Sequence, residues 1–306
     1  MTTNSTLIPT LAYAAVGHPI TRCGASLIPV YLHAASIDIA TGPDCGVTVG
    51  EQQSAEVPTL LANNPGDRVV LLVDGQIVEG GLQTRILNVS VLVGAHQQLS
   101  IPVSCVEHGR WSGGGSFIQG GSFATRRVRR AKSETLGDSV RSRGTKHSDQ
   151  GTVWNSVASE LSRLNVRSDS GSLSAAEGRL HGDDRIATAV DELCRLGPLP
   201  GQCGVIVAHG SRIVSLELFA TPTMLGTHWG ALVAGMMLDA PAAEPTIRPS
   251  LTRALRFVDW VANGQATVTD GVGLGREHHV RTTRLVAQAL VYENVLVHLS
   301  AFALAA

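Results

Sequence analysis

The spacing of hydrophobic residues changes about halfway along this chain, from a period of two to a period near 3.6. From about residue 25 to 111, short apolar runs alternate with polar turn residues, as in DRVVLLVDGQIV and ILNVSVLVGAHQQLSIPVSCVE. Such runs predict strands, and Asp74-Gly75 predicts a tight hairpin turn within the first of them. A second turn is expected at residues 94–98. Short strands at this spacing are typical of a β-sandwich or a barrel-like sheet.

Helical spacing dominates after residue 150. Two sets of four apolar residues recur at helical intervals: Val153, Val157, Leu161 and Leu164, and then Ile186, Val190, Leu193 and Leu196. Further helices are expected at 222–238 and 250–263. CGVIVAHGSRIVSLELF predicts a hairpin that turns near Gly210, and LVAQALV and VLVHLSAF predict a closing pair of strands. The expected fold class is therefore α+β, with an antiparallel sandwich or barrel-like part first and helices and further β-hairpins after it.

Residues 112–150 break both patterns. Its first ten positions contain five glycines. The segment has three acidic residues and eight basic ones, which are Arg126, Arg127, Arg129, Arg130, Lys132, Arg141, Arg143 and Lys146. We interpret this segment as a flexible, solvated Gly/Arg-rich loop, with attraction of a polyanion as the less favoured alternative. The domain organisation expected is a β-rich part (1–111), this loop (112–150) and an α+β part (151–306) packed with the first as one unit.

Composition narrows the class of protein. The 306 residues are 43% hydrophobic and 16% charged, with a formal net charge of −1. This is a globular composition, not that of a disordered or nucleic-acid-coating chain. Without a membrane-length apolar run or an N-terminal export signal, the chain is expected in the cytoplasm. The five scattered cysteines form no C-x-x-C pair and the histidines show no metal-ligand spacing, so no metal and no particular cofactor is predicted.

Two charged residues continue apolar rows of the predicted strands. Arg85 precedes Leu87 and Val89 at alternate positions, and Glu107 follows Val103 and Cys105. Charges at such positions are rare unless they are paired or functional. One interpretation is a buried ion pair between Arg85 and Glu107 that fixes strand register. The other is a pocket in which Arg85 binds an anion and Glu107 acts as a base or ligand. The residues alone leave these two evenly balanced.

The residues next to Glu107 add further candidates. Arg110 could bind a phosphate in a bidentate manner and Trp111 could stack on a base, although an indole that simply covers a sheet edge is somewhat favoured. Cys105 is the one credible nucleophile, but a buried core cysteine is the commoner case. The glycine runs SGGGSF and GVGLG lack the features of nucleotide-binding loops.

Several blocks in order resemble a known family, the ARG and rhodanese-phosphatase-superfamily-associated protein domain, in which ARG denotes an ADP-ribosylglycohydrolase. The blocks are VTVGEQ with VPTL, VVLLVDGQIVEGGLQTRILNVSVLV, IPVSCVEHGRW, QGTVW, GQCGVIVAHG, VGLG and VHLSAF. The matching positions are Glu51, Gln83, Arg85, Asn88, Cys105, Glu107, Gly109, Arg110, Trp111, Gln150 and Trp154. Leu82, Thr84 and His108 depart from the family pattern, which has lysine, asparagine and commonly glutamine at these places.

The resemblance implies a link, by association, to NAD or ADP-ribose metabolism. The favoured hypothesis is an enzyme acting on a nucleotide or ADP-ribose-type ligand, its site formed by residues 79–111 and closed by the 112–150 loop. Glu107 and Cys105 are the catalytic candidates, and the expected ligand contacts are Gln83, Arg85, Asn88, Arg110, Trp111, Glu79 and Gln150. The alternatives are a non-catalytic nucleotide-binding or protein-interaction module and a structural scaffold. ADP-ribose-processing enzymes are the expected partners; a nucleic acid is less favoured, and a membrane is not expected.

Overall fold

The computed structural model describes residues 3–5, 8, 11–33, 35–114, 116–241, 245 and 247–304. The chain divides into two compact units, each with a hydrophobic core of its own. Unit 1 comprises Met1–Ile37, Asp184–Asp270 and Gly275–Ala306, and unit 2 comprises Asp38–Asp183 and Gly271–Leu274. The long segment of unit 2 is thus inserted between the first and second segments of unit 1, and its short segment lies between the second and third.

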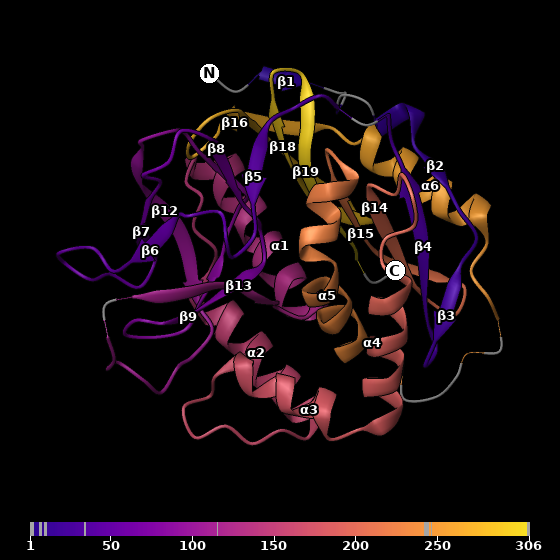
Figure 1. Cartoon of the computed structure of the whole chain (residues 1–306), viewed down its shortest axis with the longest axis horizontal. Coiled ribbons are helices and arrows are strands. Elements are labelled where there is room, and N and C mark those ends of the chain that lie inside the picture. Colours follow the sequence, from indigo (N-terminus) through magenta and orange to yellow (C-terminus); the bar gives the residue numbers. More distant parts are fainter. Residues whose placement is uncertain are drawn as a thin grey trace. The chain divides into compact units, whose positions relative to one another are not determined.

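Unit 1 is built on a ten-stranded antiparallel sheet (Figure 1). In spatial order its strands are β1 (Thr3–Ser5), β16 (Ala266–Asp270), β17 (Arg276–Arg281), β18 (Leu285–Tyr292), β19 (Val295–Ala303), β15 (Arg212–Phe219), β14 (Gly204–His209), β4 (Ala25–Tyr31) and β2 (Ala15–Val16), with β3 (Ile20–Arg22) also paired to β4. The expected hairpins at Gly210 and at the closing strands are confirmed as β14–β15 and β18–β19.

Helices cover both faces of this sheet. Leu216 and Leu218 share a core cluster with Phe257 of α6 (Leu251–Ala262), whereas Phe219 stacks on His228 of α5 (Pro222–Leu238). Because successive strand residues point to opposite faces, α5 and α6 lie on opposite sides of the sheet. α4 (Asp184–Leu196) packs against α5, and η1 (Leu11–Tyr13) packs against α6. The helices expected at 222–238 and 250–263 are confirmed.

Unit 2 contains a six-stranded sheet that is nearly closed into a barrel. Its order is β13 (Phe117–Phe123), β9 (Gln76–Gly80), β10 (Arg85–Leu87), β12 (Gln98–Cys105), β7 (Thr59–Asn63) and β6 (Thr48–Gly50). A single bridge between Gly50 and Ser116 joins the two edges. A second sheet has the order β11 (Val91–Val93), β8 (Val69–Leu72) and β5 (Ile39–Thr41). The barrel-like sheet and the α+β class agree with the sequence-based expectation.

Two longer helices and two short ones complete unit 2. They are α1 (Arg126–Arg143), α2 (Gln150–Leu164), η2 (Leu173–Glu177) and α3 (Gly178–His181). α2 begins after Asp149, whose carboxylate accepts a hydrogen bond from the Thr152 N–H at 2.7 Å, and ends at Asn165, which has φ +54°. α1 ends at Gly144 with φ +69°, a backbone conformation that glycine adopts without strain.

The two hairpins expected between residues 69 and 105 are wrong. The Asp74-Gly75 corner separates β8 from β9, and residues 94–97 separate β11 from β12, yet each of these pairs is split between two sheets. The reason at the first corner is that Asp74 is buried. Its carboxylate forms ion pairs with Lys132 and Arg129 of α1, so the chain turns around a charge cluster and the flanking strands do not pair with each other.

The expectation of a flexible loop at 112–150 is also wrong. β13 pairs with β9 in this segment, and α1 occupies 18 of its residues. Arg129 and Lys132 are not solvated but almost completely buried, because Asp74 and the backbone carbonyls of Leu87 and Asn88 accept their hydrogen bonds. The boundaries expected at 111 and 151 therefore both lie inside unit 2, and the structure divides the chain differently.

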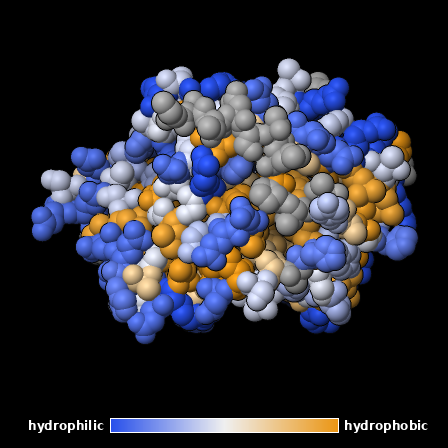
Figure 2. Space-filling model, turned by 90° about the horizontal axis from the view of Figure 1, so that it is seen from above, coloured by the Kyte–Doolittle hydropathy of each residue, from blue (hydrophilic) through white to orange (hydrophobic). Residues whose placement is uncertain are grey.

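Polar and apolar residues are intermixed on the face drawn in Figure 2. Among the large apolar side chains that are exposed within the described residues are Trp111 of unit 2 and Trp260 of unit 1. None of the helices that the structure describes has the length and hydrophobicity needed to cross a bilayer.

Candidate functional site

Three neighbouring strands of unit 2 bring the residues of the signature segment (79–111) together. β10 lies between β9 and β12, and Arg85 is paired in register with Val78 on one side and Cys105 on the other. Directly opposed residues of antiparallel strands point to the same face, so Arg85 and Cys105 share one face of the sheet. Because β12 ends at Cys105, residues 106–111 leave the sheet beside Arg85.

Glu107 is the centre of a hydrogen-bond network that joins three segments of the chain. Its Oε2 accepts from the Thr84 N–H at 2.9 Å, the Thr84 hydroxyl at 2.8 Å and Arg110 Nη2 at 2.7 Å. Its Oε1 accepts from the Ser170 hydroxyl at 2.7 Å. The carboxylate is only 5% exposed, so these donors replace the water that burial removes.

Burial by itself would raise the pKa of Glu107, but the hydrogen bonds from Arg110, Ser170 and Thr84 together outweigh it and lower the pKa to about 2. The carboxyl group is therefore ionised at neutral pH and holds no proton to donate. Both of its oxygens already accept hydrogen bonds, so it is also poorly disposed to take one. Glu107 consequently fixes its neighbours in place.

Arg110 is the strongest of those neighbours. Besides its bond to Glu107, its Nη1 donates to the carbonyls of Gly81 at 2.9 Å and Ser112 at 2.6 Å, and its Nη2 donates to Gly80 at 3.2 Å. Its guanidinium thus ties the end of β9 to the segment after β12. The two terminal nitrogens are engaged by protein acceptors, so Arg110 is not available as the phosphate clamp that the sequence suggested.

The segment around Ser170 is held against residues 106–109 by backbone contacts. Gly109 N–H donates to Ser170 O at 2.7 Å, and Leu173 N–H donates to Val106 O at 2.9 Å. A Cβ at position 109 would lie 3.1 Å from both the Cα and the carbonyl oxygen of Ser170. Glycine at 109 therefore allows the close approach that brings the Ser170 hydroxyl to Glu107.

Arg85 has the opposite environment to Arg110. Its side chain is completely buried, at 0% exposure, and Nε, Nη1 and Nη2 all lack a hydrogen-bond partner within the described residues. Its closest described partner is the indole of Trp111, whose ring centroid lies 5.8 Å from the Arg85 Cζ. Trp111 itself is 52% exposed.

The buried guanidinium is electrostatically strained. Burial lowers the pKa of Arg85 and the nearby charge of Arg110 acts in the same direction, while Cys105, Glu51 and Glu107 oppose the shift. Two buried acceptors, Glu51 Oε2 and Gln83 Oε1, also lack hydrogen-bond partners among the described residues. Their other side-chain atoms are used: Glu51 Oε1 accepts from Leu82 N–H at 3.0 Å, and Gln83 Nε2 donates to Glu107 O at 3.1 Å.

The register-setting ion pair between Arg85 and Glu107 is not formed. Arg110, three residues after Glu107, occupies the position on its carboxylate that the pair would have needed. Both charges are nevertheless buried in one region of unit 2, and they interact electrostatically without a hydrogen bond.

The remaining candidates form hydrogen bonds with other groups of unit 2. Gln150 exchanges two hydrogen bonds of 2.8 Å with the backbone of Cys105. The Cys105 thiol donates to Glu107 O at 3.1 Å. Asn88 accepts from Ser104 at 2.7 Å and donates to Lys146 O at 3.2 Å, and Glu79 accepts from the Ser174 hydroxyl at 2.5 Å. None of these contacts involves Arg85.

Three participants were missed by sequence reasoning about the residues themselves. Thr84 supplies two donors to Glu107, although it was noted only as a departure from the family pattern. Ser170 lies 63 positions from Glu107, in a polar stretch that carries no motif. Glu51 was noted as a family position but given no role. The signal for Glu51 was its place in VTVGEQ, whereas Ser170 had none.

A cavity of about 820 Å³ adjoins this network, between α2 and residues 166–171. His108 and Trp154 line it, with their rings edge to face at 4.4 Å between centroids. It shares the Ser170 segment with the Glu107 network, because Asp169 and Gly171 are also part of its wall. No group of three or more His, Cys, Asp or Glu side chains that could hold a metal ion is found in the part of the chain that the structure describes.

The comparisons with known proteins agree with the resemblance of the signature segment. A family model described as the ARG and Rhodanese-Phosphatase-superfamily-associated Protein domain matches residues 15–302. The comparisons with curated proteins and with solved structures gave no match. Since the family model covers nearly the whole chain, including both units, the chain belongs to the ARG and Rhodanese-Phosphatase-superfamily-associated Protein domain family.

Proposed function

We propose that unit 2 is a receptor for a phosphorylated ligand of the nucleotide or ADP-ribose type, with Arg85 as its anion contact. The observation that carries this proposal is the fully buried Arg85 guanidinium without a hydrogen-bond partner in the described residues. An unpaired buried charge is costly for a fold, and evolution retains one chiefly where a ligand or a reaction needs it.

The chemistry of a guanidinium selects the group that it binds. Arg85 presents a planar fork of N–H donors, which matches the oxygens of a phosphate or a carboxylate in a bidentate manner. In a buried site such a bond is stronger than in water. Arg110 shows the contrast within the same segment, because its terminal nitrogens already bond to protein oxygens.

The two unpartnered acceptors narrow the ligand class further. Glu51 Oε2 and Gln83 Oε1 need donors, whereas a bare phosphate dianion offers only acceptors. A sugar phosphate supplies both kinds of group, because its hydroxyls donate while its phosphate accepts. The family resemblance to ADP-ribose-associated proteins favours ADP-ribose among such molecules, and enzymes that process it are the partners we propose.

Trp111 is the element through which the ligand enters. It lies over the Arg85 guanidinium and is the half-exposed member of the pair. Because the indole is half exposed, we propose that its side chain rotates to admit the ligand to the guanidinium. Its indole then provides a stacking surface for a base.

Binding without turnover is the function that Glu107 favours. A general acid at neutral pH needs a raised pKa, and the pKa of Glu107 is held at about 2. Glu107 is a positioning residue that keeps Arg110 and Ser170 in place around the site.

The test is calorimetric titration of the full chain with ADP-ribose, AMP, ribose 5-phosphate and adenosine. The three phosphorylated compounds should bind and raise the melting temperature, whereas adenosine should not. Arg85→Met should abolish binding, and Arg141→Met, which removes an exposed guanidinium of α1, should leave it unchanged. Absence of binding by all three phosphorylated compounds, or unchanged affinity in Arg85→Met, would overturn the proposal. Release of a new product would replace the receptor function with an enzymatic one.

Arg85→Met also reports on whether the charge serves the fold. Replacing an unpaired buried charge with an apolar side chain of similar length removes a desolvation cost, so the unliganded variant should be more stable by about 1–3 kcal/mol. Urea unfolding without ligand measures this. A large loss of stability would show that Arg85 has a structural partner after all.

A further inference from the structure

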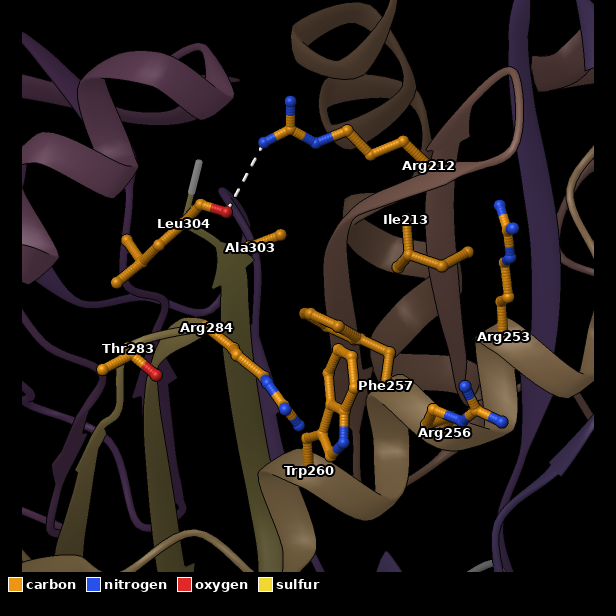
Figure 3. A pocket seen from close by; sticks show the side chains of 10 residues that line it. All are labelled: Arg212, Ile213, Arg253, Arg256, Phe257, Trp260, Thr283, Arg284, Ala303 and Leu304. Atoms are coloured by element: carbon orange, nitrogen blue, oxygen red, sulfur yellow. Dashed lines mark hydrogen bonds between the residues drawn. The ribbon is translucent and has the colours of Figure 1, made fainter. Parts of the chain in front are cut away.

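Unit 1 contains a pocket that is separate from the residues discussed so far. It has a volume of about 300 Å³ and lies where α6 meets the ends of β15, β18 and β19. Its apolar floor consists of buried Ile213, Phe257 and Ala303. Figure 3 shows Ile213 and Phe257 in the middle of the pocket, with the four arginine side chains around them.

Those arginines are Arg212, Arg253, Arg256 and Arg284, and no aspartate or glutamate is among the residues that line the pocket. Two of them donate to backbone carbonyls: Arg212 Nη2 donates to Leu304 O at 3.4 Å, and Arg253 Nη1 donates to Ser211 O at 3.0 Å. Within the described residues no carboxylate forms an ion pair with any of the four. Among the described residues, four positive charges therefore surround the pocket without a carboxylate paired to them.

Trp260 forms the aromatic part of the rim. The Arg284 guanidinium lies over its ring, with Cζ 4.6 Å from the centroid, and Figure 3 shows the two side chains side by side at the edge of the pocket. Trp260 is 37% exposed. An anion bound to Arg284 therefore lies next to an apolar surface as well as to a charge.

We propose that this pocket binds a small organic anion with a compact apolar body, such as a medium-chain carboxylate. The buried floor receives the apolar body and the arginines receive the charged head. The volume is at the lower end of the range of about 300–1,000 Å³ for ligand pockets, which excludes a large ligand. The apolar floor distinguishes the site from a surface that merely attracts polyanions, because phosphates or nucleic acid would leave it uncovered.

The experiment is calorimetric titration of the full chain with octanoate, with 1-octanol and inorganic phosphate as matched probes. Octanoate should bind saturably at one site, and the two probes should each bind at least about tenfold more weakly, since each lacks one half of the recognised chemistry. If 1-octanol bound as tightly as octanoate, the pocket would recognise only the apolar body. If inorganic phosphate bound as tightly as octanoate, the pocket would recognise only the charge. Either result, or no binding of octanoate, would overturn the proposal.

Variants locate the binding event. The double variant Arg256→Ala/Arg284→Ala should weaken octanoate binding at least about tenfold, because two charge-assisted contacts are lost. Arg195→Ala removes an exposed arginine of α4 outside the pocket. This variant should change the affinity for octanoate less than about twofold. Equal losses in both would mean that net charge, not the pocket, attracts the anion. Arg85→Met should bind octanoate normally, and a loss of octanoate binding there would place the anion at Arg85 instead.

Discussion

Two buried cations of unit 2, Lys132 and Arg85, differ in whether the protein supplies acceptors for their hydrogen bonds. Lys132 is fully buried, and its ammonium group binds the Asp74 carboxylate and the carbonyls of Leu87 and Asn88. Arg85 is equally buried and has no acceptor in the described residues. Removal of Lys132 would leave Asp74 poorly compensated, whereas removal of Arg85 would relieve a cost. The first charge therefore supports the structure, and the second is the one that we propose for a ligand.

Glu107 gives a prediction about pH at the residue scale. Its pKa is lowered from 4.5 to about 2 in the folded chain, so its ionised form contributes about 3 kcal/mol of stability at neutral pH. A depressed pKa means that this contribution is present above about pH 4.5 and is lost as the pH falls towards 2. Glu107→Gln should therefore be less stable by about 2–4 kcal/mol at neutral pH, and the difference should shrink on acidification.

Urea unfolding of both proteins between neutral pH and about pH 3 measures that difference. Glu79→Gln is the control, because within the described residues the Glu79 carboxylate accepts one hydrogen bond, from the Ser174 hydroxyl, and no large loss is expected. A difference for Glu107→Gln that stays constant with pH would show that the carboxylate is not stabilised in the folded state.

At the scale of elements, the sequence predicts helices better than strand pairing. α2, α4 and α6 follow local apolar periodicity, and the caps Asp149 and Thr221 mark where α2 and α5 begin. Pairing of strands is not local. Asp74-Gly75 has the composition of a hairpin turn. Asp74 nevertheless bonds to Lys132, 58 residues later, and β8 and β9 belong to different sheets. Nothing in the turn itself records that contact.

In the candidate site, too, local features could be predicted from the sequence and long-range contacts could not. Glu107 and Arg110 were recognisable because they lie three residues apart in one block, and their contact is local. Arg85 was recognisable as a charge in an apolar row. That Arg85 does not pair with Glu107, and that Thr84 and Ser170 complete the network, depends on contacts between distant segments. Sequence periodicity does not encode such contacts.

The ion pair between Lys132 of α1 and Asp74 leads to a prediction about stability at the scale of an element. Lys132→Met removes the main partner of the buried Asp74 carboxylate and should destabilise the protein by about 3 kcal/mol in urea unfolding. Arg141→Met on the same helix breaks an exposed ion pair with Asp138 and should cost less than about 1 kcal/mol. Equal effects of the two substitutions would contradict a structural role for the Asp74 cluster.

At the scale of the whole molecule, each of the two units has a hydrophobic core among the described residues, and both units are discontinuous in sequence. The core of unit 1 draws residues from before and after unit 2, as in the pairing of Val30 in β4 with Gly204 in β14. No shift in composition marks residue 38 or 183, so the expected boundaries fell elsewhere. A domain boundary in a nested arrangement leaves no local signal when both units are β-rich.

Separate cores lead to a prediction that hydrogen exchange can check. Lys132→Met should speed amide exchange in α1, β8 and β9, which surround Asp74, and leave β14, β15, β18 and β19 unchanged, because a unit with its own core can open by itself. Wild-type protein and the Arg141→Met variant are the references. Faster exchange throughout both units in Lys132→Met would show that the chain opens as one cooperative body.

The place of β19 in the unit 1 sheet has a consequence for biosynthesis. β19 pairs with β18 on one side and with β15 on the other, so the sheet is divided until this strand is available. It is the last described strand to leave the ribosome, whereas every strand of unit 2 has been translated more than a hundred residues earlier. Unit 2 can therefore fold on the nascent polypeptide before the two halves of the unit 1 sheet are joined. A late stall in translation is consequently far more harmful to unit 1 than to unit 2.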